Sequence, residues 1–441
     1  MLKDIIKYDG VWNMRILVVS CSPWRNDNNI GNTYTNIFYG IDNIEIAYIC
    51  CGGGRPDTDF VKHHLHISEK NILRNLVNPK HKCAYTFPDN NKAAKGPVKQ
   101  SKVYDFMRTH RFQMFFFLRD LIWSFKNWIC DDLKKFVDDF KPDLIFAHFL
   151  DRSYLNEMII FLKAYTKLPL VVYAWDDVYT LKQFSLSPYF WINRLLQRRK
   201  LRTIAKLSSL MYVISEKQKD EYDKAFKGNC KILYKGFEFS KQPVYEGNNH
   251  PLKLVYSGNI GSGRYKTLAL IASALDEINR DKIKAILYIY TSSPFSYRIK
   301  RSLYFPESVR IMDFVSSDQL VFILQEADVL IHVESFDIRE GLKVRLSFST
   351  KLVDYFKSGR SIYAVGARRL SSIDYLSTNK GALIAYRKSQ IKNKLEILIK
   401  SEGIRKQYAK KSWECGQKNH QIKSIQNNLE NDLKYLVEEN L

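Results

Sequence analysis

Short runs of apolar and β-branched residues recur along the first half of the chain, separated by polar segments long enough for helices. The first run, Ile16 to Ser20, is followed by Pro23 and a polar loop that ends at Gly31, a pattern typical of a buried parallel strand and the loop to its helix. Further predicted strands are Ile44–Cys50, Asp143–Phe149, Leu168–Trp175 and Leu210–Ser215. Strands that alternate with helices predict a parallel, doubly wound α/β sheet.

A polar segment with Pro, Gly and Asn, Ser240 to Lys253, separates this pattern from a second series of strands. That series comprises Lys253–Gly258, Ala285–Thr291, Val309–Val315, Ala327–Glu334 and Ser361–Gly366. From about Ile404 the chain is charged and favours helix, and we expect this part to lie across the surface or back on the first domain. The predicted organisation is two Rossmann-like domains, 1–240 and 254–403, a linker, 241–253, and a helical segment, 404–441.

Composition fits two large cores. The 441 residues exceed the roughly 100–200 of a single domain, and 45% of them are hydrophobic. Seven cysteines form no CxxC pair, so we expect neither a disulfide framework nor a structural zinc site. Nothing before Met14 resembles a signal peptide, and no run reaches about 18 uninterrupted apolar residues. A cytoplasmic location is therefore expected, with translation starting at Met1 or Met14.

The net charge is strongly positive, because 69 Lys and Arg stand against 46 Asp and Glu, a formal charge of +23. This favours anionic partners, such as nucleic acid, phosphorylated ligands or an anionic membrane face. Nucleic acid is not expected, since no recognisable reader motif accompanies the charge. A coding bias that scatters lysines over solvated faces is the alternative explanation.

Two segments bear on the membrane. In residues 111–140 apolar side chains recur at a helical period, which indicates a buried helix of the first domain or, less favoured, a helix lying on a membrane surface. The second segment, 191–206, carries six basic residues close to aromatic ones: Arg194, Arg198, Arg199, Lys200, Arg202 and Lys206. These segments keep open a peripheral position on the inner, anionic face of the plasma membrane.

The first segment with candidate chemistry is Tyr256 to Arg264, which places three glycines and a cation between a predicted strand and a predicted helix. Exposed backbone N–H groups, the helix dipole and Arg264 together suit a diphosphate. Ordinary strand-to-helix turns also use glycine, so this loop alone does not decide between a site and a turn.

The second segment is Arg345 to Gly366, in which Ser349, Thr350 and Lys351 open a predicted helix. Hydroxyls, a helix N-terminus and an ammonium group in one place again suit a phosphate. Asp354 lies three residues further along and could bind a ribose diol, as acidic residues do in dinucleotide folds. A solvated carboxylate and an ordinary cation at a helix start are the alternatives.

The two segments together resemble the donor domain of GT-B retaining glycosyltransferases of the family 4 group, especially the enzymes of capsule and O-antigen synthesis. In that family a glycine and an arginine end a strand and, after a loop, a lysine binds the diphosphate; here Gly258, Asn259 and Arg264 hold these positions. The family's Pro-Ser-Lys start of a helix, with Glu-Tyr downstream, is similar to Ser349-Thr350-Lys351 with Asp354-Tyr355. The resemblance implies two domains facing each other across a cleft, with the second binding the nucleotide sugar.

The resemblance also implies roles for single residues. The diphosphate would be bound by Gly258, Asn259, Arg264, Ser349, Thr350 and Lys351, with Gly31 from the first domain. Asp354 would bind the ribose, and the main chain around Phe314 and Val315 would bind the base. Leu346 replaces the first glutamate of the family's glutamate pair, and Glu334 and Glu340, upstream of it, are the candidates for contact with the donor sugar.

The first domain would then hold the acceptor. Gly31 and Asn32 match a glycine-bearing loop of the family, and in Val171–Tyr179 Trp175 stands at a histidine position and Asp176 at an aspartate position. Polar groups at the carboxyl end of a strand are suited to ordering or deprotonating an acceptor hydroxyl. The catalytic candidates are Asp176, Asp177 and His148, and the candidate acceptor contacts are Asn32 and Trp175.

These observations predict a glycosyltransferase that uses a UDP- or GDP-sugar as co-substrate and a lipid-linked or polysaccharide hydroxyl as acceptor in surface-glycan synthesis. Arg264 and Lys351 would neutralise the leaving diphosphate, so no metal is required. We interpret His63, His64 and His66 as a polar surface run rather than a metal site. Retention of anomeric configuration is implied by the resemblance alone. The alternatives are a nucleotide-sugar epimerase on the same fold and a catalytically silent protein bound to the membrane surface.

Overall fold

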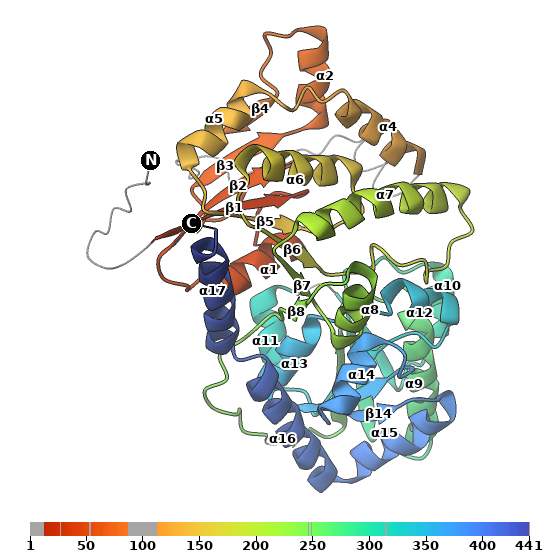
Figure 1. Ribbon diagram of the computed structural model, residues 1–441. Helices are drawn as coiled ribbons and strands as arrows, with labels where there is room; N and C mark the ends of the chain where they lie inside the picture. The colour runs from red at the N-terminus through yellow and green to blue at the C-terminus, as the bar shows by residue number, and fades with distance from the viewer. Residues whose placement is uncertain are drawn as a thin grey trace.

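The computed structural model describes residues 13–86 and 113–440, apart from residues 27, 53, 246, 248 and 314; for residues 113–118 and 317 it describes the backbone alone. The chain forms two β-sheets, called here the first and the second sheet, and helices pack around each of them (Figure 1). This arrangement confirms the predicted α/β class.

The first sheet is parallel apart from one edge strand. Its elements are β1 (Met14–Ser20), α1 (Asn29–Phe38), β2 (Ile44–Cys50), β3 (His63–Ile67), α2 (Glu69–Val77), β4 (Ala84–Thr86), α4 (Gln113–Ser124), α5 (Asp131–Phe140), β5 (Leu144–His148), α6 (Ser153–Thr166), β6 (Leu170–Ala174), α7 (Pro188–Leu207), β7 (Leu210–Val213), α8 (Glu216–Phe226) and β8 (Lys231–Ile232). The strand order is β4-β3-β2-β1-β5-β6-β7-β8, and among the described strands β4 alone runs antiparallel to its neighbour. Leu17 and Val19 of β1 pack with α5, α6 and α7, whereas Ile16 and Val18 pack with α1 on the other face. Burial on both faces explains why this strand is a continuous apolar run.

The second sheet is parallel throughout its described strands. Its elements are β9 (Leu252–Ser257), α9 (Arg264–Asn279), β10 (Ala285–Tyr290), α10 (Tyr297–Ser302), β11 (Val309–Met312), α11 (Ser317–Gln325), β12 (Val329–Val333), α12 (Ile338–Val344), α13 (Lys351–Ser358), β13 (Ser361–Val365), α14 (Ser371–Thr378), β14 (Leu383–Ala385), a short 3₁₀ turn (Lys388–Gln390), α15 (Ile391–Lys400) and α16 (Glu402–Asn419). The last helix of the chain is α17 (Ile422–Glu438). The strand order is β11-β10-β9-β12-β13-β14. Loops at the carboxyl ends of the adjacent strands β9 and β12 therefore lie side by side.

The carboxyl-terminal helices connect the two sheets. Helix α16 packs against β13 and α13 of the second sheet, and α17, dark blue in Figure 1, packs against the first sheet through Leu429, Leu433 and Val437. Where α16 gives way to α17, Phe237 N donates to His420 O at 2.8 Å and Ile422 N donates to Phe237 O at 3.0 Å. The two stretches of chain that pass between the sheets are thus hydrogen-bonded to each other, and the predicted return of the last helix to the first domain is confirmed.

The interpretation of His63, His64 and His66 as a polar surface run is wrong for His64 and His66, since only His63 is exposed among these three residues. They belong to β3, an inner strand between β2 and β4, in which His64 is buried and its Nε2 lies 2.8 Å from Val61 O. Burial lowers the pKa of His66 to about 4, so this imidazole is neutral near pH 7. A strand with three histidines lacks the apolar run that marks the other inner strands, and the pattern of apolar residues therefore does not reveal it.

Residues 113–140 form two helices instead of one. Lys126, between α4 and α5, has a φ of 57°, which ends the helical path. Trp123 and Trp128, on either side of it, are buried in the first-sheet core, as the favoured interpretation requires. Leu121 and Phe125 are exposed. Within the described part of the chain, no helix combines the length and the apolar character needed to cross a bilayer.

Candidate functional site

The glycine loop after β9 encloses the ammonium group at the start of α13. Gly258 has a φ of 123°, and a Cβ at this position would lie 2.4 Å from Lys351 Nζ, so the lysine fills the space that only glycine leaves free. Lys351 Nζ donates to Ser257 O at 2.8 Å and lies 4.7 Å from the centre of the Tyr256 ring. The two segments singled out in the sequence therefore meet at the carboxyl end of β9.

A second cation faces the same place from α9. Arg264, the first residue of that helix, donates through Nε and Nη2 to the two carboxylate oxygens of Glu334, each at 3.1 Å. Glu334 directly follows β12 and is almost fully buried. Its Oε1 also lies 3.9 Å from His332 Nε2, a buried nitrogen without a hydrogen-bond partner in the described part of the chain. We call Gly258, Arg264, Glu334 and Lys351 the cation site.

The charge at the cation site is held away from water. Burial, and next the positive charge of Arg264, lower the pKa of Lys351 to about 7, while Glu334 and Asp354 act in the opposite sense. Burial and the same two cations hold the pKa of His332 well below its usual range, so this imidazole stays neutral. With two basic side chains and one carboxylate, which pairs with Arg264, the site has electrostatics that favour an anion.

Other residues predicted to bind the donor lie around this centre. Ser349 N donates to Ser372 Oγ of α14 at 3.0 Å, and the Thr350 hydroxyl, at the N-cap of α13, makes no capping hydrogen bond. Asn259 is exposed, and its Oδ1 accepts from Gly261 N at 2.5 Å. Asp354, in the first turn of α13, lies 3.5 Å from Lys235 Nζ of the segment after the first sheet.

The remaining donor candidates are less central. Glu340 of α12 pairs with Lys343 at 3.0 Å, and its Cγ lies 3.2 Å from where a Cβ on Gly263 would stand, so it borders the glycine loop. Val315 packs at the edge of the second-sheet core, and Phe314 lies outside the described residues.

His148 and Trp175 form an aromatic pair at the carboxyl ends of β5 and β6. Their ring centres are 4.2 Å apart, and burial, with the charge of Arg152, lowers the pKa of His148 to about 3. Trp175 packs against both the first-sheet core and the core beside α13, so it lies where the two halves meet. Neither His148 Nδ1 nor Trp175 Nε1 has a hydrogen-bond partner among the described residues.

The two neighbouring aspartates have different surroundings. Asp177 is buried and accepts from Thr180 N at 2.9 Å and from Arg345 Nη2, of the second half, at 2.8 Å. Arg345 also pairs with Glu221, and its side chain is 11% exposed, so the carboxylate of Asp177 is committed to this contact. Asp176 is exposed, and its Oδ1 accepts from Ser347 Oγ at 2.5 Å.

Leu346, which stands where the family's pair has its first glutamate, has a packing role. It is 1% exposed and belongs to the hydrophobic cluster of the first sheet, although it comes from the second half of the chain. Ser215 Oγ donates to its carbonyl at 2.7 Å. The segment that begins at Arg345 therefore joins the two halves before it reaches Lys351. The sequence pattern points to phosphate binding in this segment and does not reveal the role of Arg345, because a contact between halves leaves no periodic signal.

The contacts described for Gly31 and Asn32 lie within the first half of the chain and do not involve the cation site. Gly31 lies in α1, and a Cβ there would stand 2.1 Å from Arg25 O, so the glycine allows the loop after β1 to approach the helix. Asn32 is exposed and donates through its backbone to Asn28 O. Within the described ranges, neither residue has a hydrogen bond to the second half.

Comparison with solved structures identifies the fold of the chain. No family model and no curated protein matches the sequence. Anabaena HepE in complex with UDP matches at 12% sequence identity and a TM-score of 0.61, over 96% of this chain and 100% of that one. Sucrose-phosphate synthase from Thermosynechococcus elongatus matches at 12% identity and a TM-score of 0.61, over 96% and 99%. The chain has the GT-B fold.

An α,α-trehalose-phosphate synthase (UDP-forming) from Burkholderia vietnamiensis also has this fold, at 11% identity and a TM-score of 0.57, with 96% of this chain and all of that chain covered. At such identities the similarity extends to the arrangement of the GT-B fold and not to individual side chains. The chemistry must therefore be argued from the cation site itself.

The pairing of Arg264 with Glu334 makes a stability prediction. Glu334→Gln leaves a largely buried guanidinium without its counter-ion, and we expect the free energy of unfolding to fall by about 3 kcal/mol. Glu340→Gln is the matched control, because its partner Lys343 is half exposed, and we expect a loss below about 1 kcal/mol. Urea denaturation of both variants measures this, and equal losses would contradict the assigned pairing.

Proposed function

We propose that the protein is a glycosyltransferase that moves a sugar from a nucleoside diphosphate sugar to a hydroxyl acceptor. The observation that carries the proposal is the meeting of Lys351, Arg264 and the glycine loop at the carboxyl edge of the second sheet. Ligands of open parallel sheets bind at that edge. A UDP-sugar is the favoured donor, since HepE was solved with UDP and the Burkholderia enzyme is named UDP-forming; a GDP-sugar is the alternative.

In the proposed reaction the bond between the anomeric carbon and the diphosphate oxygen breaks, and negative charge develops on the leaving diphosphate. Lys351, Arg264 and the N-terminus of α13 stabilise this charge, and no metal is needed for that role. When the diphosphate binds, Arg264 releases Glu334 and pairs with the diphosphate instead. The Glu334 carboxylate can then accept hydrogen bonds from the donor sugar. Asp354 is then close enough to the start of α13 to bind the ribose.

Asp176 is the proposed residue for ordering or deprotonating the acceptor hydroxyl. It is the exposed carboxylate at the end of β6, whereas Asp177 is committed to Arg345 and His148 is buried and neutral. The bond from Ser347 holds Asp176 next to the segment that leads to Lys351. Trp175, the neighbouring residue, is only partly buried, and we propose that its exposed part contacts the acceptor. Retention of configuration, as the resemblance implies, is part of the proposal.

The proposed acceptor is a lipid-linked intermediate of surface-glycan synthesis, reached from the membrane surface through α7. Five apolar residues of α7 and the preceding loop are exposed: Leu186, Tyr189, Ile192, Leu195 and Leu196, with exposed fractions of 84%, 63%, 55%, 57% and 62%. We call this set the α7 surface. Apolar side chains repeated at helical spacing and exposed to solvent suit a helix that lies on a bilayer.

The basic residues of α7 contribute less to this surface than the sequence predicts. Arg194 is buried and donates to Asp177 O, Arg198 donates to Tyr179 O, and Lys200 pairs with Glu157. Arg199 and Lys206 are exposed and remain available to anionic headgroups. The proposed membrane contact is therefore mainly apolar, with a smaller electrostatic part.

Charge reversal at Lys351 tests the binding of the donor. In Lys351→Glu a carboxylate replaces the buried ammonium, and we expect the affinity for UDP and UDP-glucose to fall by more than about 100-fold. Lys282→Glu, in the loop before β10 at the opposite end of the sheet, makes the same charge change and is expected to leave affinity within about twofold. Titration calorimetry on folded variants measures both. Unchanged affinity in Lys351→Glu would remove the basis of the proposed site.

The lowered pKa of Lys351 predicts a pH dependence of binding. Above pH 7 the free protein holds this amine mostly uncharged, and a bound diphosphate favours the charged form and raises its pKa. Binding therefore takes up a proton, and affinity falls as the pH rises from about 7 to about 9, by up to tenfold per unit. Calorimetry in two buffers of different ionisation enthalpy measures the uptake. Lys351→Met should abolish it, and an identical uptake in that variant would contradict the assignment.

The α7 surface is tested separately. Leu195→Ser together with Leu196→Ser is expected to lower binding to phosphatidylglycerol vesicles by at least about tenfold, because the substitutions remove apolar area from the membrane-facing surface. Phe322→Ser, at an exposed apolar position on α11, is the control and should bind as the wild type does. Co-sedimentation measures both. Equal reductions in the two proteins, or no reduction in the double variant, would refute the membrane contact.

A further inference from the structure

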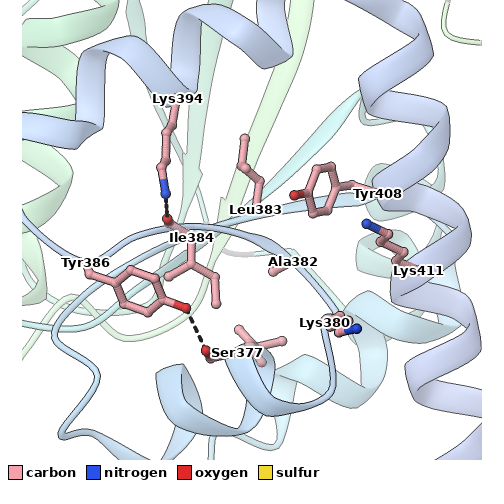
Figure 2. Close-up of a pocket in the computed structure, with 10 residues that line it drawn as sticks. Ser377, Lys380, Ala382, Leu383, Ile384, Tyr386, Lys394, Tyr408 and Lys411 are labelled. Carbon is pink, nitrogen blue, oxygen red and sulfur yellow. Dashed lines mark hydrogen bonds between the residues drawn. The ribbon is translucent and has the colours of Figure 1, made fainter.

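A second group of cations lies at the outer edge of the second sheet, away from the cation site. A cavity of about 210 Å³ opens beside β14, the edge strand, and β13 separates β14 from β12, which leads to Glu334. Three lysines line it, Lys380 after α14, Lys394 on α15 and Lys411 on α16. Figure 2 shows Lys394 and Tyr386 on one side of the cavity and Tyr408 and Lys411 on the other.

These lysines are not paired with carboxylates in the described part of the chain. No Asp or Glu is among the described residues that line the cavity, and none of the three ammonium groups forms an ion pair in the described part of the chain. Lys394 Nζ donates to Ile384 O at 2.5 Å, which fixes it over the strand. Three lysines from separate elements therefore line one cavity.

Hydroxyl donors and an apolar base complete the cavity. Tyr386 donates to Ser377 Oγ at 2.6 Å, and the Tyr408 ring lies 4.9 Å from Lys411 Nζ. Burial, and then neighbouring Tyr386, raise the pKa of Tyr408, so its hydroxyl keeps its proton near pH 7 and can donate. Leu376, Ala382 and Ile384 are buried beneath these polar groups and offer an apolar surface to a carbon skeleton.

We propose that this cavity is a binding site for a compact phosphomonoester, a small phosphorylated metabolite held by Lys380, Lys394 and Lys411. A phosphomonoester carries a charge of about −1.5 to −2 at pH 7 and several acceptor oxygens, which matches three ammonium groups and the Tyr408 hydroxyl better than a carboxylate with one charge and two oxygens does. The volume is smaller than the roughly 300–1,000 Å³ of most small-molecule sites, which limits the ligand to a phosphoryl group with a short carbon body.

The position of α14 gives such a site a connection to the cation site. Leu376 and Ser377, near the carboxyl end of this two-turn helix, line the cavity. At its amino end Ser372 Oγ accepts from Ser349 N, and Ser371 N donates to Arg345 O at 3.0 Å. The same short helix thus touches the cavity, the turn before Lys351 and the segment that joins the two halves.

The experiment uses glycerol 3-phosphate as the probe, in the full-length protein and in a Lys351→Met variant, so that phosphate binding at the cation site does not contribute. We expect saturable binding by calorimetry in both. Lys380→Asn together with Lys411→Gln should weaken it by about tenfold for each ammonium group that no longer faces the phosphate. Asparagine is chosen at position 380 because the backbone there has a φ of 54°, which asparagine tolerates.

The matched control is Lys388→Gln together with Lys418→Gln, two exposed lysines of the same region that do not line the cavity. It removes the same charge from the protein and should leave binding within about twofold of wild type. Acetate, as a carboxylate probe, should bind far more weakly than glycerol 3-phosphate. The proposal is overturned if the wild type shows no saturable binding, if the control pair weakens binding as much as the cavity pair does, or if acetate binds as tightly. None of these outcomes depends on glycosyl transfer.

Discussion

The cost of enclosing Lys351 shapes the second half of the protein. An ammonium group removed from water needs hydrogen bonds and negative charge close by, and here it has one carbonyl, one aromatic face and a carboxylate shared with Arg264. Two cations and one carboxylate leave the centre short of negative charge. The strands β9 and β12 are adjacent, so the groups that follow them lie at the same carboxyl edge of the second sheet. Gly258 has no side chain, which leaves space for Lys351. An anion that enters would relieve the deficit, so the same constraint that destabilises the free protein favours a charged ligand.

The union of the two halves depends on a short stretch just before that lysine. Arg345 inserts its guanidinium between Asp177 and Glu221, and Leu346 enters the first-sheet core. A glutamate at position 346 would have to be buried among apolar groups, which accounts physically for the departure from the paired-glutamate pattern. The two halves are therefore coupled by packing within a few residues of Lys351, and Ser347 connects Asp176 of the first half to the segment that leads into α13.

Much of the fold is predictable from the sequence because inner parallel strands are short continuous apolar runs. Strands without that run escape prediction, as β3 with its histidines and the short edge strand β14 show. At the site, the glycine loop and the Ser-Thr-Lys turn are predicted to meet, and they do. The sequence does not distinguish the two catalytic candidates Asp176 and Asp177, although Asp177 is buried and Asp176 is exposed. Contacts between distant segments, such as Arg345 with Asp177, depend on the placement of whole domains, and no local pattern encodes that.

The hydrogen bonds that tie Phe237 to the turn between α16 and α17 limit how the two halves can move. Two separate crossings could let the halves slide, twist or swing independently. The two connecting segments are hydrogen-bonded to each other at Phe237. A reorientation of the two halves would therefore have to change the backbone of both segments together. Trp175 and Arg345 also join the two halves, at a place separate from Phe237, so a reorientation of the halves would have to change these contacts as well.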